Sequence, residues 1–264
     1  MAEIHFMKTR IYSLVLLLVA SLASGTASAQ KDKGDYAPMA RPNIVKLNIS
    51  SLAYKNIALQ YERILANKIS VACQVRLMPK GSLAFTNMLD NLSNSKSNDT
   101  VKLADWKASS FAITPEFRFY PKHAGKGFYL APYFRYRTIG LDLPVNYTDG
   151  NGNLQHVSAT GHVSSIMGGL MIGSQFNFGK MITLDWFIIG LQYGSSNIKM
   201  DITTTQTMSA ADQNDVRNNL DEIKSWSKKF DKINYTVGAN GGNITGKLSM
   251  IGVRGFGLNL GFRF

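Results

Sequence analysis

The sequence has 264 residues, one cysteine and a net charge of +12, from 29 lysines and arginines against 17 acidic residues. A single cysteine excludes an intramolecular disulfide, and after the N-terminal region no uninterrupted apolar stretch reaches the roughly 18 residues that a membrane-spanning helix needs. The basic excess favours an anionic partner such as a layer of lipid head groups, although a solvated basic surface would carry the same charge.

The N-terminus has the features of a secretory signal. Lys8 and Arg10 precede an apolar run, and Ala27–Ala29 has the A-x-A arrangement of a cleavage site. We expect residues 1–29 to be a signal peptide that is cleaved before Gln30. Because an exported chain seldom meets nucleic acid, we expect no nucleic-acid partner.

Most of the remaining chain alternates between apolar and polar residues, which is the pattern of a strand with one apolar face. Pro115 and Pro132 fall inside two such segments and weaken them, since proline donates no ladder hydrogen bond. The stretch LDWFIIG is apolar on both faces, and Gly252 and Gly255 are possible marks of a bulge. The eight expected strands are Asn43–Leu52, Asn56–Arg63, Lys68–Met78, Ser110–Tyr120, Gly127–Thr138, Gly161–Phe178, Met181–Lys199 and Lys247–Phe264.

The connections between these segments alternate in length from the second one onward. In an up-and-down meander, alternate connections lie at alternate ends, so the tight turns share one end and the long loops share the other. This asymmetry, with an even number of strands, is typical of an outer-membrane barrel with tight periplasmic turns and long extracellular loops. The expected long loops are 79–109, 139–160 and 200–246.

The last long connection contains a helical pattern. Ser209 and Asp212 resemble a capping box, and apolar residues from Val216 onward recur at three- and four-residue steps. We expect a helix over about Ser209–Lys232 that packs its apolar stripe onto the barrel mouth as a lid. The alternative is a docking surface for a partner or substrate.

Alternation alone does not show which face of the strands points outward. If the apolar faces pointed inward, Phe111, Phe117 and at least nine other bulky residues would overfill the interior of an eight-stranded barrel. The reverse arrangement places charges of both signs inside, where they can pair. We therefore expect a membrane barrel, with Tyr61, Tyr120 and Tyr136 in interfacial girdles. The expected lumen charge network is Lys46, Glu62, Arg76, Glu116, Arg118, Arg135, Arg137 and Asp185.

The chain ends on apolar residues at every second position, Leu258, Leu260, Phe262 and Phe264. This end resembles the C-terminal signal by which outer-membrane barrels are handed to their insertion machinery. From about Asn43 onward the chain is similar to small OmpA/OmpX-like barrels, and FAITPEFRFYP resembles an uncharacterised family of small outer-membrane proteins of Gram-negative bacteria. The resemblance implies an outer-membrane location, with lipids, lipopolysaccharide and the insertion machinery as partners.

The expected organisation is a signal peptide at 1–29, a periplasmic N-terminal tail at 30–42 and a transmembrane barrel at 43–264. We expect a monomer without cofactor or metal, because His123, His156 and His162 lack ligand spacing. Since fold does not carry function, the expected role is non-enzymatic, in envelope structure or in surface binding through the loops. A narrow pore is an alternative, although side chains fill so small a lumen.

A lipid A-modifying hydrolase is the enzymatic alternative. His162 and Ser164 lie two residues apart on the lipid-facing side of an expected strand, and this pair is similar to the His-x-Ser motif of barrel deacylases of the PagL type. In that family the histidine removes the serine proton for attack on an acyl ester. Such a base needs an orienting carboxylate, and no Asp or Glu lies between Ser164 and Asp185. The two residues are therefore weak catalytic candidates.

Overall fold

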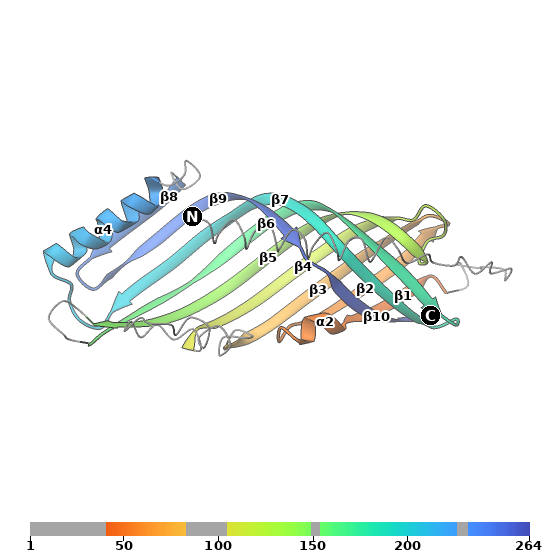
Figure 1. Ribbon diagram of the computed structural model, residues 1–264, viewed down its shortest axis with the longest axis horizontal. Coiled ribbons are helices and arrows are strands. Elements are labelled where there is room, and N and C mark those ends of the chain that lie inside the picture. Colours follow the sequence, from red (N-terminus) through yellow and green to blue (C-terminus); the bar gives the residue numbers. More distant parts are fainter. Residues whose placement is uncertain (1–40, 83–104, 149–153, 226–231) are drawn as a thin grey trace, which may run out of the picture. The chain divides into compact units, whose positions relative to one another are not determined.

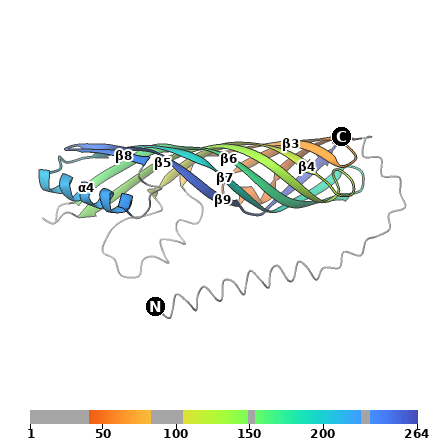
Figure 2. The same cartoon turned by 90° about the horizontal axis from the view of Figure 1, so that it is seen from above.

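The computed structural model describes four ranges of the chain (Figures 1 and 2), which are 41–82, 105–148, 154–225 and 232–264. They belong to one compact unit that spans Pro38–Phe264. The expected signal peptide and nearly all of the expected N-terminal tail lie outside these residues. Neither of the two α-helices within the described ranges is long and apolar enough to cross a membrane.

The described residues form an all-β, antiparallel sheet of ten strands with two short helical additions. The alternating segments of the sequence thus become strands. The strands are β1 (Asn43–Asn48), β2 (Ile57–Ala66), β3 (Ile69–Ser82), β4 (Lys107–Phe119), β5 (Gly127–Thr148), β6 (Leu154–Phe178), β7 (Ile182–Thr204), β8 (Ile233–Gly238), β9 (Gly241–Arg254) and β10 (Gly257–Arg263). The helices are α2 (Ile49–Leu52) and α4 (Ala210–Ser225).

Strand pairing closes part of the sheet into a ring. Neighbouring strands pair in chain order from β1 to β7, and β10 pairs with both β1 and β7. Val45 lies opposite Phe262 across the β1–β10 contact, and Leu258 lies opposite Trp186 across the β10–β7 contact. The ring therefore consists of β1 through β7 and β10. Farther along β7, β9 replaces β10 as its partner and β8 pairs with β9, so the sheet continues past the ring as an extension (Figure 1).

Several features of the sheet differ from the sequence expectation, and one is the additional strand β8, which lies inside the expected loop 200–246. The expected strand Lys247–Phe264 is two strands, β9 and β10, separated at Gly255 and Phe256. The expected loop 139–160 is mostly strand, because β5 and β6 pair without a shift from Gly127 to Thr148. The first expected strand stops at Asn48, whose side chain accepts a hydrogen bond from Ser51 N over 2.7 Å and so caps α2.

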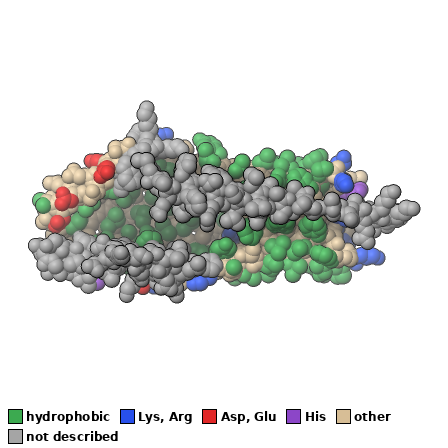
Figure 3. Space-filling view, in the orientation of Figure 1, with side chains coloured by type: hydrophobic (Ala, Val, Ile, Leu, Met, Phe, Trp, Pro, Cys, Tyr) green, Lys and Arg blue, Asp and Glu red, His purple; other side chains and the backbone are tan. Residues whose placement is uncertain are grey.

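The ring is apolar outside and polar inside. On β6, Leu170 and Phe176 point outward and are 49 % and 46 % exposed. Gln175, the residue before Phe176, points inward and is fully buried. Figure 3 shows the hydrophobic side chains gathered over this part of the molecule. We call these outward side chains the apolar belt; its members include Leu59, Val75, Ile113, Phe134, Ile166, Leu170, Phe176, Leu191, Val253, Leu260 and Phe262.

The sidedness of the sheet reverses in the extension. One residue row across β5, β6 and β7 places Thr138, Ser164 and Asn197 on the outward face. The next inward row is apolar, with Ile139 and Val163 side by side, and Ile198 follows on β7. The same strands therefore expose apolar side chains along the ring and polar side chains beyond it.

Candidate functional site

The interior of the ring holds a cluster of fully buried charges from four different strands. Lys46 Nζ lies 2.5 Å from Glu62 Oε2 and 2.6 Å from Asp185 Oδ2. Alternation places each of these side chains on the inward face of its strand. Because the side chains of Lys46, Glu62 and Asp185 have no exposed area, their charges depend on one another for compensation.

Arg118 is the centre of this cluster. Its guanidinium Nη1 lies 2.8 Å from Asp185 Oδ2 and 3.2 Å from Glu62 Oε2, and its Nη2 lies 2.8 Å from Glu116 Oε2. The guanidinium carbon also stacks 4.5 Å from the ring centroid of Tyr129. One arginine therefore ties carboxylates from β2, β4 and β7 together inside the ring.

Neutral polar side chains saturate the remaining positions of these carboxylates. Tyr120 Oη donates to Glu62 over 2.8 Å, and Tyr129 Oη donates to Asp185 over 2.8 Å. Ser70 Oγ donates to the same oxygen of Glu62 as Tyr120, Oε1, whereas the cations lie at Oε2. Tyr120 was expected in an interfacial girdle, and that prediction is wrong, because Tyr120 is fully buried in this network. Well-satisfied networks of this kind favour a single packed arrangement.

Arg254 completes the cluster and was absent from the expected network. Its Nη1 lies 2.7 Å from Glu116 Oε1, and its guanidinium carbon stacks 4.5 Å from the ring centroid of Phe187. We use the name ion-pair cluster for Lys46, Glu62, Glu116, Arg118, Asp185 and Arg254. The cluster holds as many cations as carboxylates, so it is neutral as a whole.

Three further arginines lie on the inward face of the sheet, one or more rows closer to the extension. We call Arg76, Arg135 and Arg137 the arginine cluster. Across the part of the chain that the structure describes, none of the three forms an ion pair with a carboxylate. Arg135 Nε donates to Thr114 Oγ1 over 3.0 Å, whereas the buried Nε atoms of Arg76 and Arg137 have no hydrogen-bond partner among the described residues. The structure thus divides the expected network into a paired part and an unpaired part.

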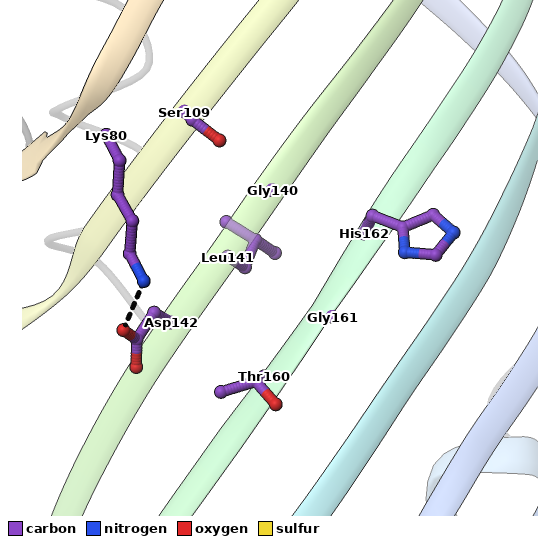
Figure 4. A pocket seen from close by; sticks show the side chains of 8 residues that line it. All are labelled: Lys80, Ser109, Gly140, Leu141, Asp142, Thr160, Gly161 and His162. Carbon is purple, nitrogen blue, oxygen red and sulfur yellow. Dashed lines mark ion pairs between the residues drawn. The ribbon is translucent and has the colours of Figure 1, made fainter.

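His162 and Ser164 lie on the outward face of β6, just beyond the apolar belt. His162 lines a cavity of about 280 Å³, and Asp142 is the one carboxylate among the described residues that line it. Figure 4 shows that Asp142 turns toward Lys80, 2.9 Å away, while the ring of His162 points away from both. Ser164 Oγ donates to Thr138 Oγ1 over 3.4 Å, and no hydrogen bond joins it to His162 within the described ranges. The pair is therefore not assembled as a nucleophile with an oriented base.

The C-terminal residues lie on the outside of the ring. Leu260, Phe262 and Phe264 are 47 %, 44 % and 51 % exposed, and Leu258 is half-buried on the same face. The rings of Phe262 and Phe264 stack with centroids 6.5 Å apart. This end of the chain thus contributes to the apolar belt.

Helix α4 lies against the extension and not over the ring (Figure 1). The expected capping box is present, since Asp212 N donates to Ser209 Oγ and Ser209 N donates to Asp212 Oδ2. Arg217 Nη2 donates to Val237 O over 2.8 Å, which joins the helix to β8. The expected continuation of the helix over 226–231 lies outside the described residues. Between helix and sheet is an apolar cavity of about 260 Å³, lined by residues that include Val157, Ile202, Met208, Val216, Leu220 and Ile244.

Comparison with known proteins adds a family but no activity. A family model described as a protein of unknown function, DUF3575, matches residues 14–219. No curated protein and no solved structure matches the chain. Within the described ranges, no group of three or more His, Cys, Asp or Glu side chains could hold a metal ion. The comparisons therefore assign no activity to the chain.

Proposed function

Since the chain belongs to the DUF3575 family of proteins of unknown function, we propose from its geometry that it is an outer-membrane β-barrel protein without enzymatic activity. The barrel has eight strands, which are β1 through β7 and the composite strand β9–β10. The extension and α4 project from the outer surface, where they bind a partner or contribute to the structure of the envelope. Lipids and lipopolysaccharide surround the apolar belt, and the barrel acts as a monomer.

The reversal of sidedness is the observation that carries the proposal. A soluble sheet has no reason to expose an apolar row at Ile166 and a polar row at Ser164 along the same strand, unless the surrounding medium changes there. On β6 the belt runs from Phe178 to Ile166, which at about 3.3 Å per residue is about 40 Å along the strand. A strand tilt of about 40° reduces this to about 30 Å, close to the apolar band of outer-membrane barrels.

The ion-pair cluster favours a barrel with a blocked interior and argues against a pore. Fully buried ion pairs bridge strands that are not neighbours in the ring: Arg118 on β4 pairs with Glu62 on β2 and with Asp185 on β7, and Lys46 on β1 also pairs with Asp185. A conducting path would have to break several of these contacts and leave buried charges unpaired, which is costly. The cluster therefore acts as a structural plug.

The outward His162 and Ser164 give no support to the hydrolase alternative. Catalysis by a serine needs a base within hydrogen-bond reach and a group that orients the base. Here Ser164 donates to Thr138, and Asp142 pairs with Lys80. Among the described residues neither contact is present, so the pair does not support a hydrolase.

Electrophoresis of the outer-membrane fraction tests the barrel. On an SDS gel, the unboiled sample is expected to run faster than the boiled one, because a closed barrel stays folded in the detergent. The absence of a shift, with the protein found in the soluble periplasm, would overturn the proposal.

Cysteine labelling in intact cells tests the position of the membrane boundary. In a Cys73→Ala background, Thr160→Cys should react with a membrane-impermeant maleimide, since Thr160 is exposed beyond the belt. Leu170→Cys is the matched control on the same strand and the same face, and it should stay unlabelled. Equal labelling at the two positions would contradict a membrane around the belt.

A further inference from the structure

We infer that the arginine cluster, Arg76, Arg135 and Arg137, binds a phosphate-type oxyanion at the end of the ring that opens onto the extension. This inference goes beyond the proposed function, because it assigns a ligand class to the interior. It rests on where the three guanidinium groups lie and on what surrounds them.

The register brings two of the arginines into one row. Arg76 on β3 and Arg137 on β5 both lie opposite Ala112 of the intervening strand β4. Ala112 is buried and carries only a methyl group, so a small residue separates the two long cationic side chains in this row. Ser165, the next residue of the row on β6, is also small and buried. The row therefore has cations at its sides and small residues between them.

Arg135 lies on the same inward face of β5, two residues before Arg137. It is 7 % exposed, and its charge is opposed by those of Arg254, Arg76 and Arg137. Grouped cations of this kind are costly unless an anion or water compensates them. Arg254 is already neutralised by Glu116, so the three arginines above it carry the excess charge.

Unsatisfied donors give the second argument for a ligand. Within the described part of the chain, the buried Nε atoms of Arg76 and Arg137 have no partner, although buried polar groups are nearly always hydrogen-bonded. A guanidinium presents donors in a fork that matches the oxygen atoms of phosphate, and two or three forks around one anion give charge-assisted bonds. An oxyanion between the arginines would satisfy donors that no described residue reaches.

The next inward rows toward the extension are apolar. They are relevant to whether the anion is a free phosphate or a phosphate carried by an alkyl chain. Ile139, Val163 and Ile198 follow the arginine row, and Leu141 and Met200 come after them. A phosphate carried by an alkyl chain would meet cations at its head and apolar side chains along its tail. A free phosphate would use the cations alone.

Calorimetric titration of the full-length mature protein, folded in a neutral maltoside detergent, tests the site. One arm uses inorganic phosphate, and the other uses hexyl phosphate, a soluble monoalkyl phosphate. Binding in the first arm with no gain in the second identifies a site for free phosphate; tighter binding in the second identifies an amphiphile. Either result supports the site, and binding should weaken as salt is added.

Variants separate the arginine cluster from general charge effects. Arg76→Gln and Arg137→Gln should each weaken binding about tenfold or more, as expected for the loss of a charge-assisted hydrogen bond. Arg63→Gln is the matched control, because Arg63 is exposed on the outside and bonds Asn43. The shift between unboiled and boiled samples shows that each variant is folded. Absence of binding in both arms, or equal binding by wild type and the two cluster variants, would overturn the inference.

Discussion

Arg118 and Asp185 meet inside the ring with Nη1 and Oδ2 2.8 Å apart, although 67 residues separate them in the sequence. The contact joins β4 to β7, which are not neighbours in the sheet. Backbone ladders hold each strand only to the strands beside it, so contacts of this kind are what tie opposite walls together. The stability of the ring should therefore depend on the ion-pair cluster.

Removing the central cation should destabilise the protein strongly. Arg118→Gln leaves three carboxylates, those of Glu62, Glu116 and Asp185, with fewer partners, and loss of one member of a buried pair costs about 3–5 kcal/mol. Urea unfolding in detergent measures this loss of unfolding free energy. The exposed Arg63→Gln is the control and should change it by less than about 0.5 kcal/mol. Similar small effects of both variants would show that the cluster contributes little.

Loss of an arginine from the arginine cluster should not lower the unfolding free energy. Arg137 has no carboxylate partner within the described ranges, so Arg137→Gln removes repulsion without breaking an ion pair. In phosphate-free buffer, the unfolding free energy should stay unchanged or rise by up to about 1 kcal/mol. A loss as large as that of Arg118→Gln would mean that Arg137 has a carboxylate partner after all.

A charged side chain on the outer face of β6 should destabilise the protein within the apolar belt, where lipid surrounds the strand, and not beyond it. Leu170→Arg places a cation on the outer face within the belt, where such changes cost about 2–4 kcal/mol near the membrane centre. Thr160→Arg lies on the same face of the same strand, beyond the belt, and should be nearly neutral. Unfolding from lipid vesicles measures both variants. Equal costs would argue against a change of medium along β6.

The alternating pattern predicts much of the sheet. It does not predict the two positions at which the inward and outward faces of a strand exchange. At Ile172 and Gly173 of β6 the register on β7 moves from Ile189 to Phe187, so one extra residue of β7 turns Phe187 inward. Strict alternation along LDWFIIG cannot reveal where such an irregularity falls, because both faces are apolar. A one-residue shift exchanges the two faces of a strand.

The break between β9 and β10 has the same effect on Arg254. Counting by twos back from Phe264 places Arg254 outside with Phe256, whereas the interruption at Gly255 turns it inward onto Glu116. The glycines in this segment mark a possible bulge but not its direction. The missing sixth member of the ion-pair cluster was therefore not predictable from the local pattern.

The extension was misjudged for a different reason. Ile139, Leu141 and Leu143 alternate with other residues as clearly as in any expected strand, although the segment was expected to be part of the loop 139–160. The apolar face there points to the inside of the sheet, the reverse of the ring. Alternation could have revealed the strand, whereas its sidedness depends on the surrounding medium.

The contact between α4 and β8 should depend on pH. Tyr235 Oη donates to Asp221 Oδ1 over 2.6 Å, and this hydrogen bond, with some desolvation, raises the pKa of Tyr235. A raised pKa means that the contact is fully stabilising below the unfolded-state value of about 10 and is lost as the pH rises through the folded value. Hydrogen exchange of α4 should therefore accelerate at high pH.

Two measurements make the origin of that pH dependence specific. Tyr235→Phe removes both the titrating group and the bond to Asp221, so exchange of α4 should be faster at neutral pH and should lack the extra rise at high pH. Tyrosine absorbance titrations of the two proteins should differ by one group, which ionises at raised pH in wild type and is missing in the variant. An unchanged exchange profile in Tyr235→Phe would contradict the assignment.

Ser164 should be dispensable for lipid chemistry. Its hydroxyl donates to Thr138, no hydrogen bond within the described ranges joins it to His162, and the carboxylate of Asp142 pairs with Lys80. Mass spectra of lipid A from cells that express wild type or Ser164→Ala should therefore be the same, with no acyl chain missing in either. His162→Ala provides a second comparison, because a base and its nucleophile would fail together. An acyl chain that is absent with wild type and returns in both variants would overturn the non-enzymatic role and leave the barrel itself unaffected.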